Sequence, residues 1–400
     1  MNICIIGGGA AGMMAAITAA DCGHHVLLLE RQARVGRKLL ATGNGRCNLT
    51  NVNAAPANYH GEDDSFCDYA LSAFSPESTL QWFEDHGLLT TIEEGGRVYP
   101  YSNMAGSVLD VLRYALERDD IDVHTGCTVS RIRHHGNGFT VETEKGVFIA
   151  HKVILAAGGA AGSKVGGVMD GYQLAKQLGH HRTALYPSLV QVKTDPTYPR
   201  ALKGVKANAH IKLCRGGEIL AHSKGEILFT EYGVSGPAIF DISRAVATGG
   251  DELYLELDFL PGQSIKDTEN WVTQRCESAG AREGGTLLAG TLHSRLGQMI
   301  CKAAGVTTQP CHTLTGHQMQ KIADLLRCFT LDVHGVCGFD QAQVTAGGLR
   351  TDEFDPRTME SKLVLGFYAC GEVLDIDGDC GGYNLQWAWS SGHLAGLLME

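Results

Sequence analysis

"NICIIGGGAAGMMAAITAADCGHHVLLLE", residues 2–30, contains an apolar run, a glycine-rich loop, a run of small residues and a second apolar run. Its pattern predicts a short buried strand over residues 2–7, a helix over residues 12–22 that closes at Gly23, and a second buried strand. A strand, a glycine turn, a helix and a strand in this order form the unit of a parallel α/β sheet with a right-handed crossover. The stretch therefore predicts an α/β fold.

The glycine loop has the spacing G-x-G-x-x-G at Gly7, Gly9 and Gly12. The first glycine permits a tight turn, the second lets a pyrophosphate approach the backbone, and the third allows the helix to pack closely on the strand. The N–H groups at the helix start, which include Ala10 and Ala11, would then face the anion. The loop predicts a dinucleotide site.

Glu30 strengthens this prediction because it ends the second strand, about 20 residues beyond the loop. A carboxylate at this position can accept hydrogen bonds from both hydroxyls of a ribose. It also disfavours a phosphate on the same ribose. Arg31, which follows directly, is included in the predicted site.

Length and composition exclude several classes of protein. A chain of 400 residues predicts two or three compact units. No apolar run approaches the roughly 20 residues of a membrane helix, so no integral membrane association is expected. The net charge of −11 argues against general binding of nucleic acid. Because a strand pattern follows Met1 at once, without the regions of a signal peptide, we expect a cytoplasmic location.

Thirteen cysteines are scattered along the chain, and no pair has C-x-x-C spacing. We expect most of them to be reduced and buried. Cys301, Cys311, Cys328 and Cys337 form a loose group whose spacing does not match a zinc site, and no metal is expected.

The pattern changes along the chain and indicates an inserted region. Alternation from residue 121 predicts a β-meander that leads into another buried strand. The apolar-strand-to-glycine pattern of the first residues returns in "LVLGFYACGE", from residue 363. The predicted division is a discontinuous domain of residues 1–190 and 340–400, an antiparallel β insert of residues 191–262 and a helical insert of residues 263–339.

Three further segments are rich in glycine: residues 36–51, 156–171 and 371–386. The first, "GRKLLATGNGRCNLTN", is polar and conformationally permissive, which suits a large polar anion. A simple NAD-dependent dehydrogenase would instead continue with a second βαβ half and a catalytic acid or base. FAD is long enough to need contacts from several distant segments, so the pattern favours FAD.

These segments resemble a known family. "IIGGGAAGMMAAITAA", "GRKLLATGNGRCNLTN", "LFTEYGVSGPAIFDIS", "VTAGGL" and "GEVLDIDGDCGGYNLQWAWSSG" are similar to blocks of the bacterial BaiN/RdsA-like, or aminoacetone oxidase-like, FAD-binding enzymes. The resemblance spans nearly the whole chain. It implies a two-dinucleotide-binding-type (Rossmann-like) FAD domain, interrupted by an insert with a barrel-like antiparallel part and a helical part.

The C-terminal block supplies the expected contacts to the flavin. Related flavoproteins place a glycine and an acid, here Gly371 and Glu372, against the ribityl hydroxyls. Gly381 and Gly382 predict a permissive turn, and the helix that follows would direct its N–H groups at the negative charge of a reduced flavin. The motifs and the resemblance together assign cofactor contacts to Gly7, Gly9, Ala10, Ala11, Gly12, Glu30, Arg31, Lys38, Asn44, Gly45, Arg46, Cys47, Asn48, Ala157, Gly158, Gly371, Glu372, Gly382, Tyr383, Asn384 and Leu385.

The motifs favour hydride transfer through flavin N5 to a small organic substrate, and the resemblance implies NAD(P)H as donor and an activated C=C bond, such as that of a bile-acid dienone, as acceptor. A flavin-dependent amine oxidase that uses oxygen is the alternative. A flavin-binding regulator or an RNA-modification protein is an alternative of another class. Tyr383 and Arg46 are the candidate catalytic residues, while Tyr99, His393 and Cys47 are also chemically able to donate a proton.

Overall fold

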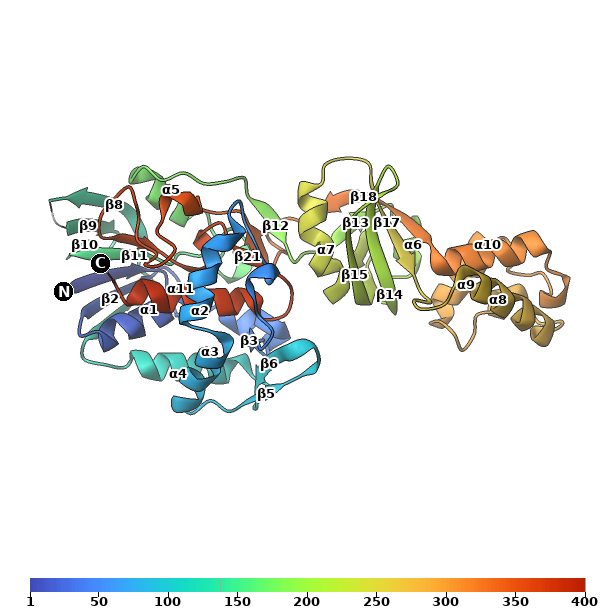
Figure 1. The fold of residues 1–400 in the computed structure, drawn as a ribbon, viewed down its shortest axis with the longest axis horizontal. Coiled ribbons are helices and arrows are strands. Elements are labelled where there is room, and N and C mark those ends of the chain that lie inside the picture. The colour runs from blue at the N-terminus through green and yellow to red at the C-terminus, as the bar shows by residue number, and fades with distance from the viewer. Residues whose placement is uncertain (137, 400) are drawn as a thin grey trace. The chain divides into compact units, whose positions relative to one another are not determined.

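The computed structural model describes residues 1–136 and 138–399 and divides into two compact units. Unit 1 comprises Met1–Pro187 and Phe339–Glu400, and unit 2 comprises Ser188–Gly338. Each unit has its own cluster of buried apolar side chains. Figure 1 gives the element labels that are used below.

Unit 1 is built on a five-stranded parallel sheet with the order β20-β11-β1-β2-β7. The strands are β1 (Asn2–Ile6), β2 (His25–Glu30), β7 (Ile121–Thr125), β11 (Lys152–Leu155) and β20 (Phe367–Ala369). From β1 the chain runs outward to β2 and β7 on one side, and β11 and β20 lie on the other side. Ligands of such sheets bind outside the carboxyl ends of the strands at this reversal of strand order.

The region after residue 121 differs from the expectation. The expected meander begins only with β8 (Val129–His135) and continues through β9 (Gly138–Thr143) and β10 (Gly146–Ala150). The preceding stretch, β7, instead pairs in parallel with β2. As an edge strand with exposed side chains it lacks the continuous apolar run of a central parallel strand, so its alternation resembled that of an antiparallel strand.

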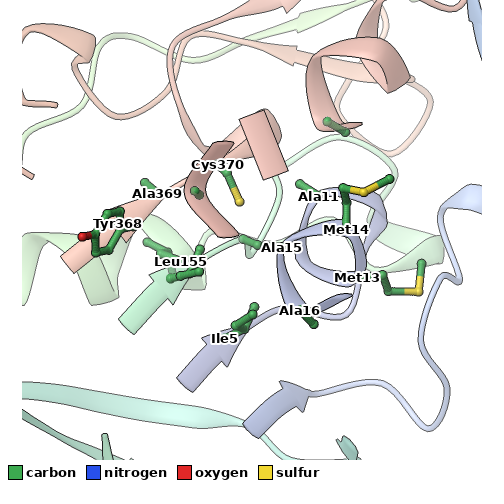
Figure 2. Packing of buried hydrophobic residues seen from close by; sticks show 14 of the residues in the cluster. Ile5, Ala11, Met13, Met14, Ala15, Ala16, Leu155, Tyr368, Ala369 and Cys370 are labelled. Atoms are coloured by element: carbon green, nitrogen blue, oxygen red, sulfur yellow. The ribbon is translucent and has the colours of Figure 1, made fainter. Parts of the chain in front are cut away.

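Two helices of unit 1 pack closely side by side: α1 (Ala10–Asp21) and α11 (Tyr383–Gly396) (Figure 1). A Cβ on Gly392 would lie 2.5 Å from the carbonyl oxygen of Ala11, and one on Gly396 would lie 2.6 Å from that of Ala15. The missing side chains therefore allow the two backbones to touch. Figure 2 shows small residues of α1 among buried side chains of three neighbouring strands, Ile5, Leu155 and Tyr368.

Two short antiparallel sheets hold the segment after the second glycine-rich loop. One has the order β3-β6-β5, and in the other β4 pairs with β21. The side chain of Asn51 donates to the carbonyl oxygen of Gly381, which brings this segment beside the start of α11. The remaining bounds in or beside unit 1 are β3 (Thr50–Asn51), β4 (Tyr59–His60), α2 (Asp68–Ala73), α3 (Pro76–Asp85), β5 (Thr90–Ile92), β6 (Arg97–Pro100), α4 (Ala105–Leu116), α5 (Asp170–Gln177), β12 (Tyr186–Ser188), β19 (Val344–Ala346) and β21 (Asp377–Gly378).

Unit 2 contains a closed antiparallel barrel with the order β13-β16-β15-β14-β17-β18. Its strands are β13 (Val192–Thr194), β14 (Lys206–Arg215), β15 (Glu218–Phe229), β16 (Gly233–Ser235), β17 (Leu253–Asp258) and β18 (Phe329–Val336). The helices are α6 (Thr197–Ala201), α7 (Pro237–Thr248), α8 (Ile265–Ala279), α9 (Ser294–Ala303) and α10 (Gly316–Arg327). The last barrel strand, β18, follows α10 and lies within the range assigned to the helical insert, so the barrel is discontinuous in sequence. The predicted fold class, a Rossmann-like α/β domain interrupted by a barrel and a helical part, is confirmed.

Most of the thirteen cysteines are buried, as expected. Cys22 in unit 1 and Cys328 in unit 2 are exposed. In the part of the chain that the structure describes, no helix has both the length and the apolar character needed to cross a bilayer.

Candidate functional site

A cleft lies at the carboxyl ends of β1, β2 and β11. Its walls come from segments that are far apart in the sequence. The predicted site residues among its lining are Gly7, Gly9, Glu30, Arg31, Lys38, Ala157, Gly158 and Glu372. The cleft therefore lies where a parallel sheet of this strand order binds its ligand.

The glycines of the first loop have different surroundings. A Cβ on Gly7 would lie 2.3 Å from the carbonyl oxygen of Ala156, and one on Gly12 would lie 1.8 Å from that of Gly7. These two glycines allow close packing. A Cβ on Gly9 would meet no atom within 4 Å, and Gly9 lines the cleft.

The start of α1 is suited to a phosphate. Gly9 is the N-cap residue, and no side chain caps the helix there. The first turn contains no acidic residue. The amides at this end, which include Ala10 and Ala11, therefore have neither a side-chain acceptor nor a nearby counter-charge of their own helix, and an anion supplies both.

The carboxylate of Glu30 is fixed at the mouth of the loop. It accepts hydrogen bonds from the backbone N–H of Gly8 at 2.7 Å and of Gln32 at 2.6 Å. A carboxylate has further lone pairs, so these bonds leave capacity for ribose hydroxyls. The neighbouring Arg31 donates to the carbonyl oxygen of Gly166 on the opposite wall of the cleft.

Lys38 and Glu372 join two further walls of the cleft. The Nζ of Lys38 lies 2.6 Å from Oε2 of Glu372, and Oε1 of Glu372 accepts the backbone N–H of Thr345 at 2.9 Å. Gly371 has a positive φ of 75°, and its amide donates to Oγ of Ser391 inside the core. Gly371 therefore turns the chain, and Glu372 faces the cleft.

The loop of residues 36–51 holds Arg46 in place. Its guanidinium pairs with Glu93, donates to the side chain of Asn103 and lies 4.0 Å from the ring centre of Tyr99. The hydrogen bond to Glu93 raises the pKa of Arg46. The structure thus favours a structural role for Arg46 over that of a proton donor.

Of two other candidates for the proton donor, Cys47 is buried and His393 is partly buried. Burial raises the pKa of the Cys47 thiol to about 12, so this cysteine is a neutral thiol at ordinary pH. Burial lowers the pKa of His393, whose ring stacks on Phe74 and whose Nδ1 lies 3.2 Å from the hydroxyl of Thr18. Neither residue lines the cleft.

Asn48 and the start of α11 form a second set of unsatisfied polar groups. The Oδ1 of Asn48 is buried and has no hydrogen-bond partner, and it lies 2.9 Å from the position of a Cβ on Gly382. Gly382, with φ of 102°, is the N-cap of α11, where no side chain caps the helix and the first turn has no acid. A buried acceptor beside the backbone N–H groups of Asn384 and Leu385, which have no acceptor among the described residues, calls for a ligand with both a donor and an acceptor. The pyrimidine ring of a flavin has an N–H group beside carbonyl oxygens, so these residues fit FAD.

The other predicted residues near this point contribute backbone. The carbonyl oxygen of Tyr383 accepts a hydrogen bond from the hydroxyl of Tyr59. The side chain of Asn384 is hydrogen-bonded to the backbone of Gly378. Only the backbone N–H groups of Asn384 and Leu385 therefore remain for a ligand. Asn44 and Gly45 form the turn before Arg46, both with positive φ, and do not line the cleft.

The structure adds residues that the sequence did not indicate. Thr128 and Val129 line the cleft because β7 belongs to the parallel sheet. Assignment of β7 to that sheet would have found them, since the chain leaves such a strand at its carboxyl end. Among the other lining residues, Gln32 and Arg34 lie outside the segments that the sequence indicated, whereas Gly8, Gly36, Arg37 and residues 165–168 lie within its glycine-rich segments.

Known proteins similar to this chain agree with the fold. The family model described as HI0933-like protein Rossmann domain matches residues 1–398. The 3-dehydro-bile acid delta(4,6)-reductase of Clostridium scindens is 39% identical, over 99% of this chain and 98% of its own length. The ribosomal RNA dihydrouridine synthase of Escherichia coli is 29% identical, over 97% of this chain and 95% of its own. The solved structure of 3-ketosteroid delta1-dehydrogenase from Sterolibacterium denitrificans aligns with a TM-score of 0.50 and 14% identity, over 99% of this chain and 98% of that chain.

Proposed function

Since this chain belongs to the HI0933-like Rossmann family, we propose that it uses FAD to add hydrogen across a carbon–carbon double bond conjugated to a carbonyl group, with NAD(P)H as electron donor. Flavin-dependent oxidoreduction is the part of this activity that the relatives establish. The observation that carries the proposal is the orphaned Oδ1 of Asn48 beside the uncapped start of α11, a set of groups complementary to a flavin ring.

Two relatives with different names support the proposed class of substrate. One is a reductase of a 3-dehydro bile acid, and the other is a dihydrouridine synthase. In both names the double bond that is saturated lies in conjugation with a carbonyl group. We infer that proteins of this fold have this chemistry in common, and that they do not have the size of the substrate in common.

The residues of the cleft have separate tasks in this proposal. The amides at the start of α1 would bind the pyrophosphate of FAD, Glu30 its ribose, and Lys38 with Glu372 the polar chain that leads to the flavin. FAD supplies the hydride chemistry when it is bound. The amides at the start of α11 stabilise negative charge at that end of the site. Tyr383, half-buried in the first turn of α11, is the proposed source of the proton.

The test is a pair of anaerobic half-reactions followed at about 450 nm, where oxidised flavin absorbs. NADH or NADPH should bleach the purified yellow protein, and a conjugated enone such as cyclohex-2-enone or a 4,6-dien-3-one steroid should restore the colour. A protein that amines bleach and oxygen recolours, without response to NAD(P)H or enone, would be an amine oxidase instead.

A second candidate is reduction of uridine in RNA, favoured by the two relatives named ribosomal RNA dihydrouridine synthase. The net charge of −11 argues against it. Recolouring of the reduced protein by unmodified ribosomal RNA, but by no small enone, would establish this candidate over the first.

A further inference from the structure

Arg97 lies at the start of α11 although its sequence position is far away. Arg97 is the first residue of β6, where it pairs with Asn51 of β3, and its carbonyl oxygen accepts the amide of Glu93. Its Nε lies 3.3 Å from the position of a Cβ on Gly381, and Cε2 of Tyr383 lies 3.4 Å from the same position. The guanidinium and the phenol ring therefore cover the same turn.

The charge of Arg97 is unmatched. Over residues 1–136 and 138–399, its guanidinium takes part in no ion pair and no side-chain hydrogen bond, although the residue is partly buried. Two acids of this region already have partners, since Glu93 pairs with Arg46 and Asp379 pairs with His60. Arg97 is thus a partly buried cation without a paired counter-charge.

The surroundings make the unmatched charge of Arg97 still less favourable in free energy. The start of α11 carries the positive end of the helix dipole, with no acid in its first turn and no side-chain cap. A partly buried cation beside another positive group is unfavourable unless an anion or a strong acceptor joins them. The space beside the guanidinium of Arg97 is accessible to a ligand, because Gly381 and Tyr383 are both only partly buried.

We propose that Arg97 binds the carbonyl oxygen of the substrate and stabilises the negative charge that develops on it; this inference rests on the proposed function. In the reaction, the β-carbon of the enone gains a hydride that originates from NAD(P)H. The electron pair of the C=C bond moves toward the carbonyl carbon, and the carbonyl electron pair moves onto oxygen, which becomes an enolate. A proton then bonds to the α-carbon and the C=O bond is restored, so that the substrate gains two hydrogens and NAD(P)H is oxidised to NAD(P)⁺.

This role gives Arg97 a part in specificity. A guanidinium that faces the oxygen favours double bonds conjugated to a carbonyl over isolated alkenes, because only the former place negative charge on oxygen in the transition state. Lysine at the same position would retain charge but not the planar pair of donors.

The test uses 4-chlorophenol as probe, because its phenolate has the charge and shape of a cyclic enolate. The FAD-bound protein is titrated with the phenol, and the dissociation constant is read from the long-wavelength charge-transfer band. Arg97→Met should weaken binding by about 10-fold to 100-fold, the range of one lost charge-assisted hydrogen bond, and Arg97→Lys should weaken it less. Arg113→Met, which removes an exposed arginine of α4, is the matched control and should bind the phenol as the unmodified protein does.

Two further readouts separate the substrate from the cofactor. In Arg97→Met, recolouring by the enone should slow by a factor similar to the loss of phenolate affinity, while bleaching by NAD(P)H, FAD content and the midpoint potential of the flavin remain unchanged. Unchanged phenolate affinity would overturn the proposal, as would a protein that binds no phenolate at all. A lowered midpoint potential with unchanged phenolate affinity would overturn it too and assign Arg97 to the flavin. If no enone recolours the unmodified protein, the proposed function fails, and the phenolate titration still decides whether Arg97 binds an oxyanion.

Discussion

At the scale of single residues, the G-x-G-x-x-G motif combines two different demands. Gly7 and Gly12 are required by the fold, because a Cβ on either would collide with a backbone oxygen. Gly9 is not required by the fold, because a side chain there would enter open space in the cleft. The structure thus divides the motif into two glycines that the fold requires and one, Gly9, that the fold does not require and for which we propose a role in binding.

Gly9→Val should therefore give a folded protein without cofactor. The backbone of Gly9, with φ of −80° and ψ of −170°, is in a region that valine adopts readily. The branched side chain would occupy the space in which we propose that the pyrophosphate binds. The ratio of flavin to protein absorbance should fall close to zero, while the thermal unfolding midpoint of the cofactor-free protein changes little. Gly12→Val is the contrast, because it should prevent folding; a yellow Gly9→Val protein would contradict the assignment of the loop.

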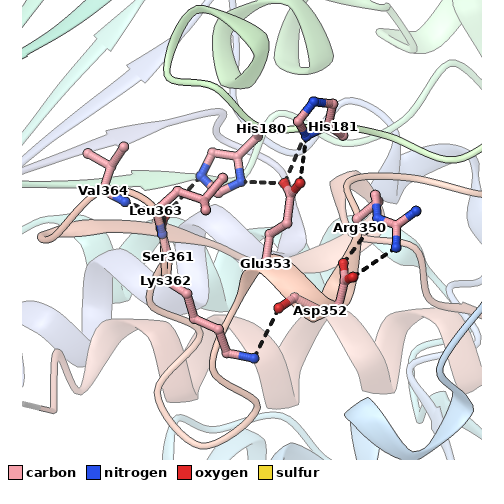
Figure 3. Close-up of polar contacts among 9 residues, drawn as sticks. All are labelled: His180, His181, Arg350, Asp352, Glu353, Ser361, Lys362, Leu363 and Val364. Carbon is pink, nitrogen blue, oxygen red and sulfur yellow. Dashed lines mark hydrogen bonds and ion pairs between the residues drawn. The ribbon is translucent and has the colours of Figure 1, made fainter.

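A second residue-scale feature is the network around Glu353 (Figure 3). Its carboxylate accepts hydrogen bonds from Nδ1 of His180 at 2.9 Å and from the amide and Nδ1 of His181. The Oγ of Ser361 accepts two amide hydrogens, from residues 363 and 364, so its own hydrogen must point to Nε2 of His180. His180 is therefore neutral, with its proton on Nδ1, and ties the end of α5 to residues 353–364.

This network predicts a loss of stability in mild acid. Burial lowers the pKa of His180 below its ordinary value of 6.5, so the unfolded chain binds a proton more readily than the folded protein. The contribution of His180 is complete above pH 6.5 and decreases as the pH falls below that value. Burial by itself would raise the pKa of Glu353, but hydrogen bonds from His181 and His180 outweigh it and lower the pKa, so Glu353 stays ionised in this window. Unfolding free energies measured from about pH 7.5 to 5 should fall with pH.

His180→Gln is the variant that isolates this effect. Glutamine can donate to Glu353 and accept from Ser361 but does not titrate. Its unfolding free energy should depend less steeply on pH between 6.5 and 5 than that of the unmodified protein, although partly buried His393 should still contribute in the same direction. An equally steep dependence would show that His180 is not the titrating group.

At the scale of elements, α11 connects the core to the site. Its two tryptophans are buried, and their indole N–H groups donate to the carbonyl oxygens of Gly371 and Leu49. These bonds hold α11 to the strand end that carries Glu372 and to the loop that carries Asn48. Close packing on α1 adds a third attachment. The position of the uncapped amides at its start is therefore determined by the core.

Gly392→Val tests this packing. Its side chain would overlap the backbone of Ala11, so the helices must separate, and overpacking of this kind costs about 1 to 3 kcal/mol or more. Urea unfolding should show the loss. Gly106→Ala in α4 is the control: its Cβ meets nothing within 4 Å, so it should change stability little or increase it by about 0.4 to 1 kcal/mol. Equal stability of Gly392→Val and the unmodified protein would show that the two helices are not in tight contact.

At the scale of the whole molecule, the chain has two separate apolar cores, one in each unit. All residues that we assign to FAD belong to unit 1. Calorimetry should therefore resolve two unfolding transitions, and FAD should raise only the one that belongs to unit 1. At a free FAD concentration of 100 times the dissociation constant, the gain is about 2.7 kcal/mol, or several degrees. Equal shifts of both transitions, or a single transition, would contradict this independence.

Local sequence was sufficient for the parts of the fold that depend on nearby residues. The strand, the glycine turn and the helix of residues 2–21 have matching apolar and small-residue patterns, and the predicted fold class is confirmed. The partner of an edge strand is a long-range property, so β7 was assigned to the meander. The place of Arg97 beside Gly381 was equally out of reach, because it follows from the pairing of β3 with β6 and not from any motif. The assigned FAD contacts remain predictions that the Gly9→Val variant addresses.

The exposed cysteines of this protein are natural sites for spectroscopic labels. Since Cys22 and Cys328 are exposed and lie one in each unit, while most other thiols are shielded in the cores, a nitroxide reagent applied to the native chain should mark both units. Dipolar spectroscopy on that doubly spin-labelled protein would then record the separation of the units before and after reduction of the flavin, without a single engineered cysteine.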